Sequence, residues 1–173
     1  MSTFLSLDPS TTRLGWATWS GEGDFFQLAG TGWNFGSFEP RRRGVVGFLE
    51  IKEFLSRLTD VNSIDVLVYE QPAYFEGSKG VIAYKQGFTI NLGIVVGIVI
   101  GVIPNLKELV GYTPQQWKGS VSKEITHARW RRAFADSAKY PNINHDAVDA
   151  IMLLYHHIYV HANMSRLEKP SSQ

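Results

Sequence analysis

The sequence predicts a single α/β domain with a mixed central sheet that opens with three antiparallel strands and is flanked by helices. Three observations predict this class. Short apolar runs separated by turn residues open the chain, later apolar runs alternate with segments of helical periodicity, and 44% of the 173 residues are apolar. Such a composition fills one core. We expect the domain to span residues 1–163 and a polar tail to follow at 164–173.

The first third of the chain reads as strands followed by one helix. Apolar runs bounded by turn residues predict strands at Thr3–Leu7, Leu14–Trp19 and Phe25–Gly32. Pro40 then opens a helix that we expect to reach Leu58. The predicted apolar stripe of this helix consists of Val45, Phe48, Leu49, Phe54, Leu55 and Leu58.

The middle of the chain predicts a buried strand, a loop and a long helix. The strand covers Asp65–Tyr69 and the loop covers Glu70–Gly80, which is rich in Pro and Gly. The helix is expected over Val81–Ile103. Its glycines recur every four residues and share one face, which would let the sheet or a second subunit approach closely. These glycines are Gly93, Gly97 and Gly101.

The last third predicts one strand and a series of helices. The strand covers Leu106–Tyr112, and Thr113 follows as the N-cap of a short helix with Pro at its first position. Two further helices are expected at Ser122–Ala138 and His145–Ala162. The most apolar run, Leu92–Ile103, is shorter than the roughly 20 residues that cross a membrane, so we expect no membrane partner.

Charge and cysteine content restrict the function only loosely. The net charge is +1, but arginines cluster at Arg41–Arg43 and at Arg129, Arg131 and Arg132. These clusters fit either a phosphate-binding face or ordinary solvated helix faces. The absence of cysteine excludes disulfides and thiolate metal sites. It fits a reducing intracellular compartment, in the cytoplasm of a host or bacterium or in an organelle, and the N-terminus shows no signal peptide.

Four carboxylates in three separate segments are the main candidates for chemistry. Asp8 and Glu70 each end an apolar strand, whereas Asp146 and Asp149 lie three apart at the start of an apolar helix and share a face. The pair fits either ordinary N-terminal helix acids or metal ligands, and Asp8 also fits a turn cap. Together they could hold two Mg²⁺ ions about 4 Å apart, or Mn²⁺, an arrangement that cuts phosphodiester bonds.

The segments around these acids resemble the RuvC family of Holliday-junction resolvases, in the RNase H-like superfamily. Leu7–Ala17 is similar to the strand–turn–strand motif that opens the family, and Tyr69–Gln71 to its second motif. His145–Ala150 is similar to its C-terminal helix motif. Gln116–Gly119 falls where the family has a basic residue. The four motifs occur in order, and the resemblance covers the chain to about His157.

The resemblance implies an RNase H-like (RuvC-type) domain with a two-ion active site. Its metal ligands would be Asp8, Glu70, Asp146 and Asp149. One ion would activate the attacking water, and the other would stabilise the leaving 3′-oxygen. Lys118 would lie near the phosphate as a fixed positive charge, and Lys123 is a second candidate. Either lysine also fits a solvated surface amine.

The resemblance also suggests residues that contact DNA. Tyr74 or Phe75 would stack on a base at the junction centre, unless they only anchor their loop. His145, beside the acid pair, is a candidate proton shuttle or an ordinary helix-start histidine. The remaining DNA-binding candidates are Lys79, Lys85, Lys123, Arg129 and Arg132. Ser10 and Pro72 depart from the family pattern and suggest a divergent viral or organellar member.

We therefore expect a homodimeric crossover junction endodeoxyribonuclease that cuts four-way (Holliday) junctions symmetrically. The glycine-spaced helix is the candidate dimer interface. One alternative keeps the fold but acts on forks, flaps or RNA–DNA hybrids. An ATP-binding protein of the actin/sugar-kinase type would need a Gly-rich loop after Asp8, yet no glycine follows until Gly15. A non-catalytic DNA-binding module would not need four acids. We expect no nucleotide cofactor.

Overall fold

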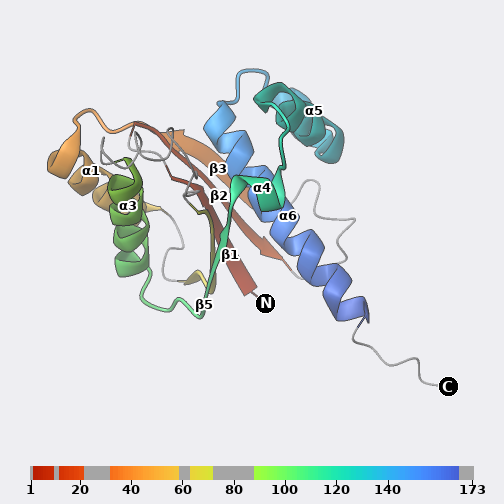
Figure 1. The fold of residues 1–173 in the computed structure, drawn as a ribbon, viewed down its shortest axis with the longest axis horizontal. Coiled ribbons are helices and arrows are strands. Elements are labelled where there is room, and N and C mark those ends of the chain that lie inside the picture. Colours follow the sequence, from red (N-terminus) through yellow and green to blue (C-terminus); the bar gives the residue numbers. More distant parts are fainter. Residues whose placement is uncertain (1, 10–11, 22–31, 59–62, 72–87, 168–173) are drawn as a thin grey trace.

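The computed structural model describes residues 2–9, 12–21, 32–58, 63–71 and 88–167 (Figure 1). A five-stranded sheet forms the centre of this part of the chain, in the order β3-β2-β1-β4-β5. Its strands are β1 (Ser2–Asp8), β2 (Leu14–Gly21), β3 (Trp33–Phe38), β4 (Val66–Glu70) and β5 (Glu108–Tyr112). The helices are α1 (Gly44–Arg57), α3 (Phe88–Val102), α4 (Pro114–Trp117), α5 (Lys123–Ala133), the 3₁₀ helix η3 (Ala135–Lys139) and α6 (His145–Leu167).

The sheet is mixed, as predicted. The first three strands form an antiparallel meander, in which β1 pairs with β2 and β2 with β3. β4 and β5 then add to the other edge of β1 in parallel. The parallel pairs place the carboxyl ends of β1, β4 and β5 at one edge of the sheet, where a functional site can form.

The third strand of the described sheet follows the range that the sequence predicted for it. Most of the predicted range Phe25–Gly32 lies outside the described residues, and the observed β3 begins at Trp33. No strand was predicted at residues 33–38, which include Gly36. The glycine is tolerated there because the Trp16 indole of β2 packs against it, 3.2 Å from where a Cβ would lie.

The boundaries of three helices differ from the predicted ones. The predicted helix at Ser122–Ala138 is divided, because the buried Phe134 has an extended backbone between α5 and η3. The helix expected at Val81–Ile103 is observed from Phe88 to Val102, and residues 81–87 lie outside the described ranges. α6 continues past Ala162 into the predicted tail.

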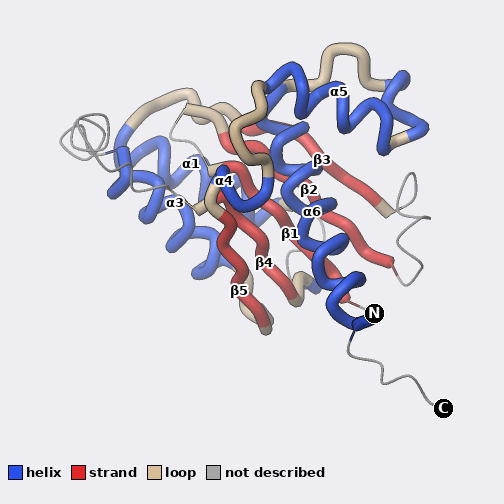
Figure 2. The backbone as a smooth tube through the Cα atoms, turned by 45° about the vertical axis from the view of Figure 1, so that its right-hand side comes forward, coloured by secondary structure: helices blue, strands red, loops and turns tan. Residues whose placement is uncertain are grey.

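Alternate residues of the strands face two helical layers. Leu5 and Leu7 of β1 and Leu67 of β4 pack with α1 and α3 in one buried cluster. The residues between them face the opposite side, where α6 crosses the sheet (Figure 2). This period of two fixes which strand residues can meet the start of α6.

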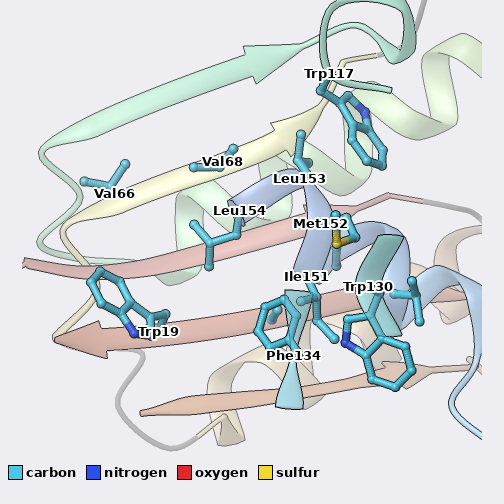
Figure 3. Close-up of a cluster of buried hydrophobic side chains, with 13 residues drawn as sticks. Trp19, Val66, Val68, Trp117, Trp130, Phe134, Ile151, Met152, Leu153 and Leu154 are labelled. Atoms are coloured by element: carbon cyan, nitrogen blue, oxygen red, sulfur yellow. The ribbon is translucent and has the colours of Figure 1, made fainter. Parts of the chain in front are cut away.

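The core between the sheet and α6 is the more aromatic of the two. Figure 3 shows Trp117, Trp130 and Phe134 around the side chains of α6, with Val66 and Val68 on the strand at the upper left. The helix is also tied to the middle of β1 by a polar contact, because the buried Ser6 hydroxyl donates to the Ala150 carbonyl over 2.6 Å. Both kinds of contact fix α6 across the sheet.

The predicted apolar stripe of α1 is partly wrong. Its buried residues are Gly47, Ile51 and Leu55, spaced by four. Val45 and Leu49, assigned to the stripe, have exposed fractions of 73% and 59%. Phe48, Phe54 and Leu58 do pack against the buried cluster. The buried face of α1 is therefore narrower than the sequence predicted. Val45 and Leu49 remain on the outer surface as exposed apolar side chains.

The glycine face of α3 points away from the sheet. Val95 and Val99 are buried on the inner side, whereas a Cβ on any of the three glycines would meet nothing within 4 Å in the described structure. The alternative that these glycines let the sheet approach closely is therefore wrong. Within the described residues, no helix is long and apolar enough to cross a membrane.

Candidate active site

Asp8 and Glu70 lie at the ends of neighbouring parallel strands. Leu7 of β1 pairs with Tyr69 of β4, so the two acids are the next residue on each strand. Both continue the series of positions that face α6, after Ser6 on β1 and Val68 on β4. The strand register therefore brings two of the predicted ligands together.

The other two acids are delivered by the first turns of α6, which lies directly on β2. A Cβ on Gly15 would overlap with the carbonyl oxygen of Asp146, so the helix backbone touches the strand there. Gly15 is in turn the β2 partner of Asp8. Asp149, one helical turn further along, has an exposed fraction of only 3%. The start of α6 is thus held against the end of the β1–β2 hairpin.

The electrostatics of Asp8 indicate that the other three acids lie near it. Burial raises the pKa of Asp8 well above its usual range, and the charges of Glu70 and Asp149 raise it further. Asp146 adds to the same effect, and only Lys118 opposes it. The structure therefore brings together the four acids and the lysine that the sequence selected.

Lys118 bridges two of these carboxylates. Its Nζ lies 3.0 Å from Glu70 Oε2 and 3.2 Å from Asp149 Oδ2. Burial opposes the charge on the amine, but the two carboxylates outweigh it and raise the pKa of Lys118 above its usual value. The alternative of a solvated surface amine is wrong for this residue.

Trp117 is a member of the site that the sequence analysis did not select. Its indole Nε1 donates to Glu70 Oε2 over 2.9 Å, and Lys118 Nζ lies 4.6 Å from the centre of the same ring. Trp117 therefore orients the carboxylate and supports the amine. The only signal in the sequence was its position next to Lys118, between a capped helix start and Gly119.

The short helix α4 fixes Trp117 and Lys118 after β5. The predicted cap is confirmed, because the Thr113 hydroxyl accepts from the Gln116 N–H while the Gln116 side chain accepts from the Thr113 N–H. Gly119 then has φ of 65°, a left-handed conformation that favours glycine and ends the helix. The cap and the glycine together leave a single turn, which points Trp117 and Lys118 at Glu70.

The carboxylate oxygens of the four acids are ligands that suit divalent cations. In the described structure, however, these side chains are not arranged around one point. Two carboxylates, Glu70 and Asp149, contact the half-buried Lys118, and Asp149 Oδ1 is buried without a hydrogen-bond partner among the described residues. Arg13 lies 3.9 Å from Asp146 but bonds more closely to Glu39, at 2.7 Å. No three acids or histidines of the described segments are close enough to enclose an ion. The Lys118 amine stands between Glu70 and Asp149, where it neutralises part of their charge.

His145 has a neighbour that the sequence did not reveal. Its ring lies 4.2 Å from that of His127 on α5, between centroids. Burial lowers the pKa of His127, and the charges of His145 and Arg131 lower it further. His127 Nε2 is also buried without a partner among the described residues. The role of His145 as a proton shuttle stays a prediction.

The predicted DNA-binding residues divide into two groups. Lys123, Arg129 and Arg132 lie exposed on α5, next to α6. The others, Tyr74, Phe75, Lys79 and Lys85, lie outside the described residues. Arg129 lines a small pocket together with Lys118.

The sheet order, the antiparallel start and the flanking helices define an RNase H-like fold of the RuvC type. Among solved structures, Thermus thermophilus RuvC in complex with a Holliday junction substrate is similar, with a TM-score of 0.68 and 15% identity over 95% of this chain and 97% of that one. A second Thermus thermophilus RuvC structure has a TM-score of 0.63 and 15% identity, over 94% and 96% of the two chains. No family model matches the sequence, and no curated protein does.

Proposed function

We propose that the protein is a metal-dependent endodeoxyribonuclease that resolves four-way DNA junctions. The observation that carries this proposal is that Asp8, Glu70, Asp146 and Asp149 lie near one another, with the Lys118 amine bonded to two of them. Its fold supports the assignment, since the Thermus thermophilus RuvC with this fold was solved with a Holliday junction substrate.

Each residue of the site has a proposed role. The four carboxylates would hold two divalent ions, Mg²⁺ or Mn²⁺, which would supply an activated water and neutralise charge on the phosphate. Trp117 keeps Glu70 turned towards the site. Lys118 offers a fixed positive charge to the phosphate once its carboxylate partners bind cations. His145, exposed at the start of α6, would pass a proton to solvent.

The outer face of α3 supports the homodimer. Ile90, Ile94 and Ile100 are exposed on this helix beside the three glycines, so the surface is apolar and allows close approach. α1 packs against α3 and adds exposed Val45 and Leu49. A second copy of this chain would cover this surface and set two active sites around a dyad, as two symmetric nicks require.

The dimer is tested by its mass in solution. The Ile94→Asp variant should sediment as a monomer in analytical ultracentrifugation, because dimer formation would bury its carboxylate in the interface. Ser37→Asp, exposed on β3 on the side of the sheet that faces α6, is a control for added charge away from α1 and α3. A wild-type protein that sediments as a monomer, with and without junction DNA, would overturn the dimer but not the active site.

We further propose that α5 and the segment after β4 contact DNA. Lys123, Arg129 and Arg132 give α5 an exposed basic surface beside the acids. Tyr74 or Phe75 would stack at the junction centre, and Lys79 and Lys85 would contact phosphates.

Cleavage of defined substrates tests the activity. Labelled four-way junction, fork, flap, RNA–DNA hybrid and linear duplex are incubated with Mg²⁺ and either wild-type protein or Asp146→Asn. Glu108→Gln, exposed on β5, is the matched isosteric control. We expect paired symmetric nicks in the junction alone, lost only in Asp146→Asn. Cutting of every substrate would indicate a broader nuclease, and ATP binding without cutting would overturn the proposal.

A further inference from the structure

An arginine at the edge of the acid cluster lies between two carboxylates. One terminal nitrogen of Arg13, Nη2, lies 2.7 Å from Glu39 Oε2, and the other, Nη1, lies 3.9 Å from Asp146 Oδ2. The first distance is that of a charge-assisted hydrogen bond, whereas the second is too long for a hydrogen bond. The guanidinium is therefore bonded to Glu39 and only close to Asp146.

The strand register brings Arg13 and Glu39 together. Leu14 of β2 pairs with Phe38 of β3, so Arg13 and Glu39 are the next residues on the two antiparallel strands. Pro40 favours an extended backbone for the residue before it, so Glu39 continues the direction of β3. The period of two places both residues on the side of the sheet that faces α6. The pair thus lies on the same side as the acids of this helix.

The carboxylate of Asp146 is not needed to cap its own helix. Asn144 does this instead, because its Oδ1 accepts from the Asp146 N–H over 2.8 Å. The backbone of Asp146 also lies against Gly15, two residues after Arg13. Because both contacts fix the start of α6, the Asp146 carboxylate stays within reach of the guanidinium.

Asp146 differs in this respect from two other acids of the cluster. Glu70 and Asp149 are already bonded to Lys118, at 3.0 and 3.2 Å, so a divalent cation must displace an amine from them. At Asp146 the nearby cation is held 3.9 Å away, in contact with Glu39. A guanidinium keeps its charge at any pH at which proteins are folded, so only its position can decide how far it opposes a metal ion.

We propose that Glu39 is a positioning residue that holds Arg13 away from Asp146 and so keeps this carboxylate available to a divalent cation. The inference rests on the metal-dependent site proposed above. Without the Glu39 carboxylate, the guanidinium would turn to Asp146 and compete with the cation for its oxygens. The side chains of Arg13 and Glu39 have exposed fractions of 38% and 64%, so water weakens their pairing. We therefore expect Mg²⁺ affinity to change by about 2- to 5-fold.

A double-mutant cycle tests the proposal without relying on cutting. Mg²⁺ is titrated by calorimetry into wild type, Glu39→Gln, Arg13→Gln and the double variant. Glu39→Gln should bind Mg²⁺ about 2- to 5-fold more weakly than wild type, whereas the double variant should bind as tightly as Arg13→Gln. Glu53→Gln is the matched control, because it removes the same charge from an exposed pair with Arg57 and should leave Mg²⁺ affinity unchanged.

The cycle separates positioning from a simple effect of charge. Equal Mg²⁺ affinity in Glu39→Gln and wild type would overturn the inference. So would an equal loss from Glu39→Gln with and without Arg13, because Glu39 would then act through its own charge. A purely structural role would lower the melting temperature of Glu39→Gln in EDTA and leave Mg²⁺ affinity unchanged, which would also contradict the proposal.

Junction cutting, measured in parallel, distinguishes this inference from the proposed function. The expected cycle in a protein that cuts no DNA would support the role of Glu39 and overturn the nuclease. Cutting by a protein in which Glu39→Gln binds Mg²⁺ like wild type would support the nuclease and overturn the role of Glu39. A wild-type protein that binds no Mg²⁺ would overturn both.

Discussion

Gly15 of β2 lies directly against the backbone of Asp146, the first acid of α6, with no room for a Cβ between them. The same glycine pairs with Asp8 in the β1–β2 ladder. A residue without a side chain therefore sets the distance between a strand that carries one candidate ligand and a helix that carries two. The position at which α6 crosses the sheet depends on this contact.

Replacement of Gly15 by Ala should displace the start of α6. The added Cβ would overlap with backbone atoms, which cannot rotate away as a side chain can. We expect the free energy of unfolding to fall by about 3 kcal/mol or more, and Mg²⁺-dependent cutting to be lost. Urea unfolding followed by circular dichroism measures the first effect, and cleavage of the junction measures the second.

Ser37→Ala provides the control for this strand position. Ser37 pairs with Gly15 across β2 and β3 but is exposed, so its replacement should change stability by no more than about 0.5 kcal/mol. A stable, active Gly15→Ala protein would show that α6 does not rest on this glycine.

Replacement of Lys118 by Met should separate its structural and chemical roles. Without the amine, Glu70 and Asp149 repel each other, so the metal-free protein should lose roughly 1–3 kcal/mol of stability. Mg²⁺ should raise the melting temperature of this variant more than that of wild type, because no amine competes for the carboxylates. Cutting should fall about 100-fold.

The exposed Lys123 supplies the comparison for Lys118. Lys123→Met removes the same charge from α5 and should leave the metal-free melting temperature unchanged. An equal shift by Mg²⁺ in wild type and Lys118→Met, measured by scanning calorimetry, would refute a competition between amine and cation.

The hydrogen bond from Trp117 to Glu70 should matter for metal affinity. Trp117→Phe keeps an aromatic ring but removes the N–H donor, and such orienting partners typically contribute about 10- to 100-fold in affinity. Mg²⁺ titration by calorimetry measures this loss. Trp130→Phe is a matched control, since its buried N–H has no partner among the described residues. Equal Mg²⁺ affinity in Trp117→Phe and wild type would exclude the orienting role.

Asp65 should make the fold sensitive to acid. Lys107 bonds to its carboxylate and the Thr3 N–H donates to it, so these contacts lower the pKa of Asp65. Because the folded pKa lies below the unfolded value of about 3.9, the stabilisation is complete above that value and is lost as the pH falls through the folded pKa.

Asp65→Asn tests this linkage. Its melting temperature should lie below that of wild type at pH 5–7, roughly constant across that range, and the gap should close below about pH 4. Lys107→Gln should behave in the same way, since it removes the first partner of Asp65. A gap that persists unchanged in acid would mean that the carboxylate charge does not stabilise the sheet.

The sequence predicted the proximity of the four acids better than it predicted the core of α1. The positions of Asp8 and Glu70 follow from strand ends and a period of two, and that of the acid pair from helical spacing, so local geometry was sufficient. The buried line of α1 depends on which neighbours cover it. Val45 satisfies the helical period but faces outward, because α3 and the sheet cover the line through Ile51 instead.

Contacts between distant segments were not visible in the sequence. Trp117 bonds to a residue 47 positions earlier, and His127 meets His145 through the packing of α5 on α6. Neither follows from a local pattern, because an apolar or aromatic residue at helical spacing predicts only burial. The sequence also could not predict that the α3 glycines face away from the sheet, because a helical spacing does not say which side of the helix packs against the sheet.

The hydroxyl of Ser6, bonded to the carbonyl of Ala150, joins the first strand of the chain to its last helix. This connection has a consequence for synthesis on the ribosome. The early strands emerge with one face uncovered and with only Asp8 and Glu70 in place. The remaining acids arrive with His145–Leu167. A nascent chain therefore cannot bring the four acids together before α6 has been translated, and a chain arrested before α6 lacks both the acid cluster and the cover of its aromatic core.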